Sequence, residues 1–287
     1  MEPGNNKEDI INDNYSVLMS VYKNDKPEYL RLAIESMLSQ TKAPEQFVIV
    51  IDGPIPGDIK EVIHYYKTKY SELFTVVPLS KNGGLGNALN HGIKACRNEL
   101  IARMDADDIS KPDRCEKQLS LFKSNPRLDI VGTQIDEFID TTDHVVSRRQ
   151  VPLTNDDIQV FSRRRSPFNH PTVMYRKSTL DRVGGYMAYG RKEDLDLFIR
   201  MMNSGCYAAN LPEALLWYRT GKDNLKRRKT WINCKENIEV MWKFYRKGYC
   251  KTMDIIYVIV GQTTMFLLPE KAAELVVGKF LRKKVDN

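Results

Sequence analysis

Three carboxylates follow an apolar run in the segment Asp105-Ala106-Asp107-Asp108. The run LIARMD (100–105) predicts a buried strand, so these side chains lie on the loop that leaves it. An Asp-x-Asp pair sets two hard oxygen ligands on one side of an extended backbone, which suits Mg²⁺ or Mn²⁺ bridging to a diphosphate. A solvated acidic turn is the alternative, because Asp is common in turns. The position at the end of a strand favours the metal site.

Two further polar features follow apolar runs. Asp52 ends the run FVIVID (47–52), where its carboxylate contacts a nucleotide base or ribose, or simply belongs to the turn that follows. The segment NGGLGN (82–87) opens a helical stretch, and its glycines would let backbone amides approach a ligand. It fits a dinucleotide fingerprint poorly, because Leu89 stands where the third glycine should be. A structural turn, or a loop beneath a ligand, is the better interpretation.

Glu193 and Asp194 begin a strongly amphipathic stretch that predicts a helix over 193–204. Acids at a helix start complement the helix dipole and cap the helix, which is the simpler interpretation. The other is a general base held at the helix start and pointed into a crevice. His170 has no second histidine, cysteine or carboxylate at metal-binding spacing, so a structural histidine is the better interpretation of that residue.

The first hundred residues alternate apolar runs with helical stretches. Strands are predicted at 15–21, 47–52, 73–79 and 100–105. These runs are apolar throughout, which is typical of a parallel sheet covered on both faces. Ligands of such sheets bind beyond the carboxyl ends of the strands. The loops at Tyr22, Asp52, Asn82 and Asp105 should therefore line one crevice.

The pattern changes after Asp105. A helix is predicted at 113–125, and strand-like segments follow at 128–135, 144–151, 172–176 and 206–210. Farther on, apolar residues recur at three- and four-residue steps and predict a helix with one apolar face, made of Trp231, Cys234, Ile238, Met241 and Tyr245.

The net charge of +7 on the 287 residues is unevenly placed. Residues 1–150 carry 19 basic and 23 acidic side chains, whereas residues 151–287 carry 25 and 14. The segment 219–251 alone holds 11 basic and three acidic groups. Such local basic charge indicates an anionic partner, either phospholipid or nucleic acid.

Composition excludes several classes of protein. With 42% hydrophobic and 28% charged residues, the chain is neither disordered, collagen-like nor a coiled coil. The polar segment 1–14 has no apolar core, so we expect no signal peptide. The five cysteines have no CxxC spacing and are expected to be reduced cytosolic thiols. No stretch reaches the roughly 20 apolar residues of a spanning helix, and 255–268 comes nearest.

Taken together, these segments resemble glycosyltransferase family 2, the inverting enzymes of GT-A fold that use nucleotide sugars. The resemblance covers about residues 15–220 and is carried by VLMSVYKNDKPEYLRLAIESMLSQT, VIVIDG, NGGLGNALNHGIKACRNELIARMDADD, PDRCEKQL, NHPTVMYRKSTLDRVGGY and EDLDLFIRM followed by LPEALLWYR. It is nearest to the branch that builds bacterial O-antigen, capsule or exopolysaccharide. It implies an α/β fold with a Rossmann-like, mostly parallel central sheet flanked by helices, and a C-terminal helical extension.

The resemblance assigns a nucleotide-sugar site. Ser20 and Tyr22 would contact the nucleotide after the first strand. Asp52 would bind the base, and Asn82 and Arg103 would lie near the nucleotide.

It also assigns the reacting groups. Asp105 would approach the ribose or diphosphate and share the metal with Asp107, the main protein ligand of Mn²⁺ or Mg²⁺. Asp194 corresponds to the catalytic base, which reverses the preference for capping, and Glu193 would assist with donor or acceptor. His170 falls on the acceptor side.

The implied reaction moves a hexose, from UDP-Glc or UDP-Gal, to a hydroxyl of a polyprenyl-diphosphate-linked saccharide and forms a β-linkage. The implied division is a polar tail at 1–14, a catalytic domain at 15–218 and a basic extension at 219–287. Within the catalytic domain, 15–108 would be the nucleotide-sugar half and 109–218 the acceptor half.

The basic extension would then serve a cytoplasmic enzyme that is peripheral on the inner face of the plasma membrane. A helix that carries basic residues beside tryptophans suits an anionic membrane surface, here Lys226, Arg227, Arg228 and Lys229 beside Trp231 and Trp242. The segment 255–268 would add an interfacial contact. Equally, these apolar faces would pack on the catalytic domain or form a homodimer.

Two other functions remain open on the sequence. A sugar-1-phosphate nucleotidyltransferase shares the sheet and the metal carboxylate but usually has a glycine-rich loop after its first strand, where this chain has YKNDKPEYL. A nucleic-acid-binding module would use the basic segment, yet it leaves Asp52, the Asp-x-Asp segment and the Glu-Asp pair unexplained. We therefore expect no nucleic-acid partner.

Overall fold

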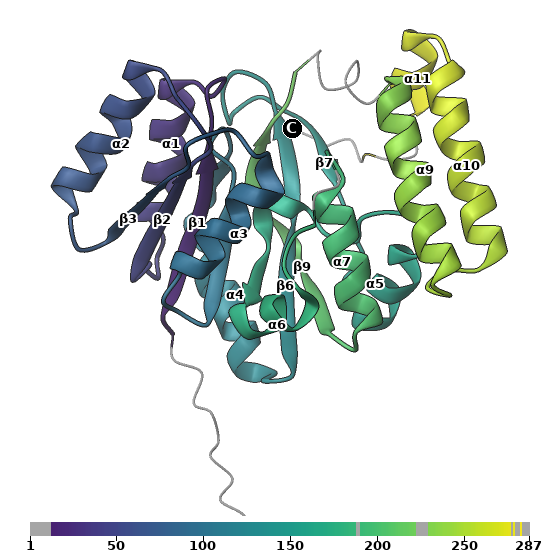
Figure 1. Ribbon diagram of the computed structural model, residues 1–287, viewed down its shortest axis with the longest axis horizontal. Helices are drawn as coiled ribbons and strands as arrows, with labels where there is room; N and C mark the ends of the chain where they lie inside the picture. The colour runs from purple at the N-terminus through teal and green to yellow at the C-terminus, as the bar shows by residue number, and fades with distance from the viewer. Residues whose placement is uncertain (1–12, 188–189, 222–228, 277, 279–281, 283–287) are drawn as a thin grey trace, which may run out of the picture.

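The computed structural model describes residues 13–187, 190–221, 229–276, 278 and 282 (Figure 1). Most of the predicted tail 1–14, and the basic residues Lys226, Arg227 and Arg228, lie outside the described residues.

The four predicted N-terminal strands form the parallel half of the sheet. They are β1 (Tyr15–Val21), β2 (Gln46–Ile51), β3 (Phe74–Pro78) and β4 (Leu100–Met104), in the spatial order β3-β2-β1-β4. All three pairings among them are parallel, as predicted. The connecting helices are α1 (Pro27–Leu38), α2 (Gly57–Lys69) and α3 (Leu85–Ala95). The strand order reverses at β1 and β4, which is where open α/β sheets bind ligands.

The second half extends the same sheet with mixed pairing. Its strands are β5 (Ile109–Ser110), β6 (Leu128–Phe138), β7 (Val145–Arg149), β8 (Met174–Arg176) and β9 (Tyr207–Arg219). The order continues from β4 through β8, β6 and β9 to β5, and β7 pairs with β6. β8 runs antiparallel to both β4 and β6, whereas β6 and β9 are parallel. The strand predicted at 206–210 is thus longer and reaches Arg219.

Five further helical segments belong to this half: α4 (Arg114–Ser124), α5 (Asn155–Ser162), the 3₁₀ turn η1 (His170–Thr172), α6 (Lys177–Val183) and α7 (Glu193–Asn203). α4 and α7 match the predicted helices, and the sequence analysis did not predict α5 and α6.

Helices cover both faces of the sheet (Figure 1), which explains why the four N-terminal strands are largely apolar. Along β1, Val17 and Met19 join one core with residues of α1, α2 and α4. Leu18 points to the other face and joins a second core with residues of α3, α6 and α7. Because successive side chains of a strand point to opposite faces of the sheet, alternate residues of β1 enter the two different cores.

The C-terminal extension is a helical hairpin of α9 (Trp231–Arg246) and α10 (Thr252–Leu267), followed by α11 (Glu270–Val276). Its buried residues form a third core with Leu195 and Ile199 of α7. The buried face of α9 contains Cys234, Val240, Met241 and Phe244. The predicted face was therefore partly wrong, because Trp231 is 55% exposed. Within the described part of the chain, no helix is both long and apolar enough to cross a membrane.

Candidate active site

A crevice of about 230 Å³ opens beyond the carboxyl end of β4. It brings together five of the predicted site residues from three separate parts of the sequence: Arg103, Asp105, His170, Glu193 and Asp194. A second cavity of about 240 Å³ shares Leu85 and Glu193 with it and is lined mainly by the segment 83–87. The predicted base therefore lies in the same crevice as the first carboxylate of the Asp-x-Asp segment.

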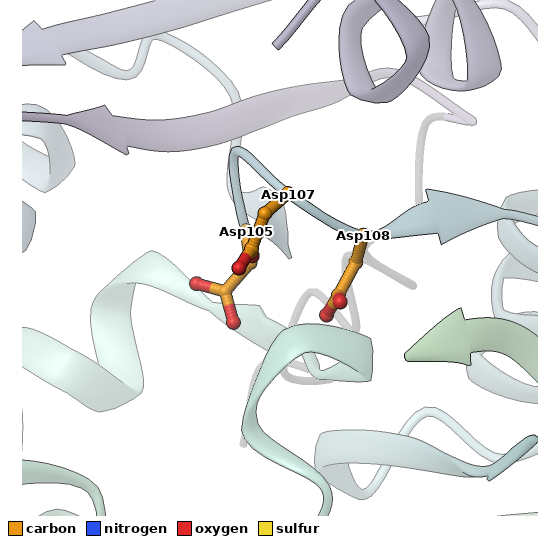
Figure 2. Close-up of side chains that lie close together, drawn as sticks. All are labelled: Asp105, Asp107 and Asp108. Carbon is orange, nitrogen blue, oxygen red and sulfur yellow. The ribbon is translucent and has the colours of Figure 1, made fainter. Parts of the chain in front are cut away.

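The loop after β4 gathers three carboxylates (Figure 2). Each of Asp105, Asp107 and Asp108 offers one oxygen within 4.8 Å of the others. Asp107 reaches solvent, Asp105 is half-buried, and Asp108 is buried completely. Asp105 and Asp107 are the metal ligands predicted from the sequence, and Asp108 lies close enough to join them.

Burial and mutual repulsion make the loop electrostatically unfavourable without a counter-charge. Burial, then the charges of Asp107 and Asp105, raise the pKa of the Asp108 carboxyl well above its usual value. Asp107 reaches solvent on one side, but protein surrounds the rest of its carboxyl. This partial burial and the charge of Asp105 raise the pKa of Asp107 to about 6. Asp108 Oδ2 is buried and has no hydrogen-bond partner among the described residues. This oxygen-rich, under-compensated group fits a hard divalent cation such as Mn²⁺ or Mg²⁺.

Asp25, which the sequence analysis missed, faces the same group. Burial is the main cause that raises its pKa to about 7, and the charges of Asp107 and Asp105 add to it. Its Oδ2 accepts a hydrogen bond of 2.8 Å from the backbone N–H of Tyr22. Asp25 is therefore a further acidic group close to the carboxylate loop, and no signal in its own loop distinguished it from a turn residue.

Two arginines hold the carboxylate loop. Arg103 is buried on β4 and forms an ion pair with Asp105. Its Nε and Nη1 have no partner within the described part of the chain, which leaves buried donors beside the crevice. Arg219, at the end of β9, donates its backbone N–H to Asp108 Oδ1 (2.9 Å) and its Nε to the Asp107 carbonyl (2.9 Å). The sequence analysis gave Arg219 no role.

Asp52 holds the glycine-rich loop. Its two carboxylate oxygens accept hydrogen bonds from the backbone N–H groups of Gly83 (2.8 Å) and Gly84 (3.1 Å), and Asn82 Nδ2 donates to its carbonyl (3.1 Å). The glycine amides thus bind a carboxylate of the chain itself. Contact of Asp52 with a base stays a prediction beside this observed structural role.

The remaining predicted nucleotide contacts lie near the same edge of the sheet but do not line the 230 Å³ crevice. Ser20 is half-buried near the end of β1, and Tyr22, just beyond it, is 40% exposed. Ser20 belongs to β1, whereas Tyr22, Asp52 and Asn82 occupy the loops after β1, β2 and β3.

Glu193 and Asp194 stand in the first turn of α7, where they complement the helix dipole. The N-cap residue is Lys192, and no side chain caps this helix, so capping does not account for them. Glu193 is only 7% exposed, and its Oε2 has no partner among the described residues. Burial, then the neighbouring Asp194, raises the pKa of Glu193 to about 7.

His170 lies in the crevice wall within a hydrogen-bond network. Its Nε2 and the Tyr186 hydroxyl are 2.8 Å apart, and Asn90 bonds both the N–H and the carbonyl of Tyr186. Burial and the charge of Arg103 lower the pKa of His170 well below its usual value, so the ring is neutral. The network supports the structural interpretation, and a contact with an acceptor stays a prediction.

Comparison with known proteins identifies the family. The model of "Glycosyl transferase family 2" matches residues 16–197. The chain belongs to glycosyl transferase family 2. Among curated relatives of this glycosyltransferase, it is 38% identical over 229 residues to the amylovoran biosynthesis glycosyltransferase AmsE of Erwinia amylovora, which covers 79% of this chain and 84% of that protein. It is 32% identical over 271 residues to a UDP-Gal:alpha-D-GlcNAc-diphosphoundecaprenol beta-1,3-galactosyltransferase of Escherichia coli, which covers 94% and 97%.

Solved structures confirm the GT-A fold of this family 2 glycosyltransferase. The mannosyltransferase PcManGT from Pyrobaculum calidifontis, in complex with GDP-Man and Mn²⁺, aligns over 93% of this chain and 81% of its own, with a TM-score of 0.64 and 14% identity. TarS of S. aureus, in complex with UDP, aligns over 92% and 78%, with a TM-score of 0.60 and 14% identity. The predicted mostly parallel sheet flanked by helices is therefore correct.

Replacing Asp52 tests its structural role. In Asp52→Asn an amide NH₂ replaces one acceptor and faces a backbone N–H, so we expect a loss of about 1–3 kcal/mol in the free energy of unfolding. Urea denaturation of variant and parent measures it. If the free energy of unfolding is unchanged and UDP binds more weakly, Asp52 contacts the base and does not stabilise the loop.

Replacing Glu193 tests the cost of its buried charge. Because the pKa of Glu193 rises from 4.5 to about 7 on folding, the native state holds its proton longer, and the stability of the parent falls as pH rises through this interval. Glu193→Gln removes that fall and should be more stable than the parent at pH 8 by about 2–3 kcal/mol, with a much smaller gain at pH 4.5. Urea denaturation at both pH values measures the difference, and an equal effect at both would contradict the assignment.

Proposed function

We propose that this glycosyltransferase moves a hexose from UDP-Glc or UDP-Gal to a hydroxyl of a polyprenyl-diphosphate-linked saccharide in surface polysaccharide (O-antigen) biosynthesis. The observation that carries the proposal is the single crevice that contains both the first Asp-x-Asp carboxylate and the Glu193–Asp194 pair. The names of the Erwinia and Escherichia relatives support the pathway and the class of acceptor. A screen of nucleotide sugars with purified protein and Mn²⁺, read as transfer or slow donor hydrolysis, tests the donor.

The nucleotide sugar is proposed to lie across the carboxyl ends of β1 to β4. Ser20 and Tyr22 would contact the nucleotide, and Asp52 its base, with Asn82 beside them. The free donors of Arg103 support its placement near the anionic nucleotide, since buried N–H groups gain most from charged acceptors. The nucleotide half would be 15–108, and 109–218 would be the acceptor half.

Asp107, with Asp105, is proposed to hold Mn²⁺ or Mg²⁺. When bound, the cation would offset the negative charge that develops on the leaving diphosphate. The orphaned Asp108 Oδ2 and the raised pKa values of Asp107 and Asp108 support a cation here. The Mn²⁺ in the mannosyltransferase complex of like fold is in keeping with this assignment.

Asp194 is proposed as the general base. An acceptor hydroxyl is a weak nucleophile at neutral pH, so its proton passes to the Asp194 carboxylate as its oxygen bonds to the anomeric carbon. The bond from that carbon to the diphosphate breaks on the opposite face, and the nucleoside diphosphate leaves with the electron pair. One displacement inverts the centre and converts an α-linked donor to a β-glycoside. Glu193 would assist with donor or acceptor, and His170 would lie on the acceptor side.

A polyprenyl-diphosphate-linked acceptor would place the transfer reaction at a membrane. We propose a cytoplasmic enzyme, peripheral on the inner face of the plasma membrane, that meets anionic lipid through the extension 219–287. α9 and α10 pack against α7, which supports the alternative that part of this extension packs on the catalytic domain. Lipid or a second subunit would then meet the faces of these helices that stay exposed.

Asp194→Asn should abolish transfer and leave donor binding nearly intact, because the substitution removes the proton acceptor while keeping the shape of the side chain. Transfer assays and calorimetry with UDP separate the two effects. The exposed Asp181, replaced in the same way, is the matched control and should retain full activity. Unchanged turnover of Asp194→Asn would remove it from the mechanism.

Asp107→Ala should lose Mn²⁺-dependent binding of UDP, because the carboxylate most open to solvent in the group is removed. Calorimetry with UDP, in the presence and absence of Mn²⁺, measures the loss. If Mn²⁺ strengthens UDP binding equally in variant and parent, Asp107 is not the metal ligand.

A further inference from the structure

The helix α10 carries an exposed apolar face. The segment 255–268 contains no charged residue. Met253, Ile256, Tyr257, Val260 and Leu267 are exposed by 46–71%. Because these positions follow one another at helical spacing, they form a single stripe along the helix, which we call the α10 stripe.

The opposite side of α10 is already used. Ile255 and Val258 are buried in the third core together with residues of α9 and α7. Figure 1 shows α10 on the outside of α9, at the end of the molecule remote from α2. The α10 stripe therefore lies on the side of α10 opposite the third core, and Tyr257 is the stripe residue that the Arg164 guanidinium contacts.

Basic groups accompany the α10 stripe. The Arg164 guanidinium lies 5.0 Å from the ring centre of Tyr257, and its Nε pairs with Asp254 Oδ1 at 2.6 Å. Asp254 is 4% exposed, so this acid presents almost no charge to solvent. Lys247 and Lys251 are exposed just before the helix. Soon after it, the exposed Lys271 stands beside the exposed Glu270, so the excess positive charge lies at the N-terminal end of α10.

We propose that the α10 stripe is the surface that docks on an anionic lipid bilayer, with α10 lying in the plane of the interface. An uncharged stripe flanked by lysines suits acyl chains beneath anionic headgroups. A second copy of the chain fits less well, because lysine is depleted at protein interfaces and each copy would bring the same positive charge. Of the segments that the sequence offered to a membrane, this proposal rests on 255–268.

The hairpin is fastened to the helix that carries Asp194. Lys192 Nζ donates to Asn233 Oδ1 of α9 at 2.7 Å, and Lys243 Nζ of α9 lies 3.5 Å from Asp196 Oδ1. These contacts bracket Glu193 and Asp194 in sequence. A bilayer bound to α10 therefore holds the crevice at a fixed position relative to the membrane, where a lipid-linked diphosphate would present its sugar; this consequence rests on the proposed function.

Vesicle flotation of the full chain tests the surface. The variant Ile256→Glu/Val260→Glu places two charges on the α10 stripe. The matched control Leu32→Glu/Tyr65→Glu adds the same charge on α1 and α2, at residues 43% and 48% exposed. We expect the parent and the control to float with vesicles of phosphatidylcholine and phosphatidylglycerol and the stripe variant to float at least tenfold less. Vesicles of phosphatidylcholine alone should bind the parent weakly.

Failure to float, or equal flotation of both variants, would overturn the proposal. So would a dimeric parent in light scattering that the stripe variant makes monomeric without changing flotation, since that result assigns the stripe to a second copy. Equal thermal unfolding of the two variants shows that the stripe variant is folded.

Activity assays separate this proposal from the proposed function. The stripe variant should transfer sugar to a water-soluble diphosphate acceptor as the parent does, and at least tenfold more slowly to a lipid-linked acceptor in vesicles. Equal transfer to the lipid-linked acceptor would contradict the link between docking and catalysis. If the parent transfers to neither acceptor, the proposed function fails, while flotation still decides the surface.

Discussion

The repulsion among the carboxylates after β4 is the constraint on which the site depends. Asp105, Asp107 and Asp108 converge at the end of a buried strand, and burial raises the cost of charge on Asp107 and Asp108. Arg103 binds the Asp105 side chain, and Arg219 binds the Asp108 side chain and the Asp107 carbonyl, so the two arginines hold the loop in place. The fold thus holds three carboxylates close together at an electrostatic cost, which is the observation behind the proposed cation site.

The rest of the crevice follows from how secondary structure ends at the same edge of the sheet. Asp52 binds the amides of the glycine-rich loop and so fixes the segment that opens α3. The first turn of α7 brings Glu193 and Asp194 opposite the carboxylate loop. Glu193 is held there at a cost, since its raised pKa means that its charge is disfavoured in the folded state. Such a cost is typical of residues placed for function.

The C-terminal hairpin has two sides with different surroundings. Its inner side completes the packing of α7, through Leu195 and Ile199. Its outer side leaves the α10 stripe exposed. One pair of helices therefore links the helix that carries Asp194 to the surface proposed to meet lipid.

The sequence by itself determined where the first four strands and the helices between them lie along the chain, and that Asp105 and Asp107 follow a strand end, because these follow from local periodicity and from where apolar runs stop. It also placed Asp194 at a helix start. The spatial order of the strands came from the structure. Only the tertiary structure decided which side chains meet. Arg219 bonds Asp108 across 111 residues of sequence, and His170 reaches Tyr186 through a packed network. Burial, partners and charge compensation arise from such distant contacts, and no local pattern encodes them.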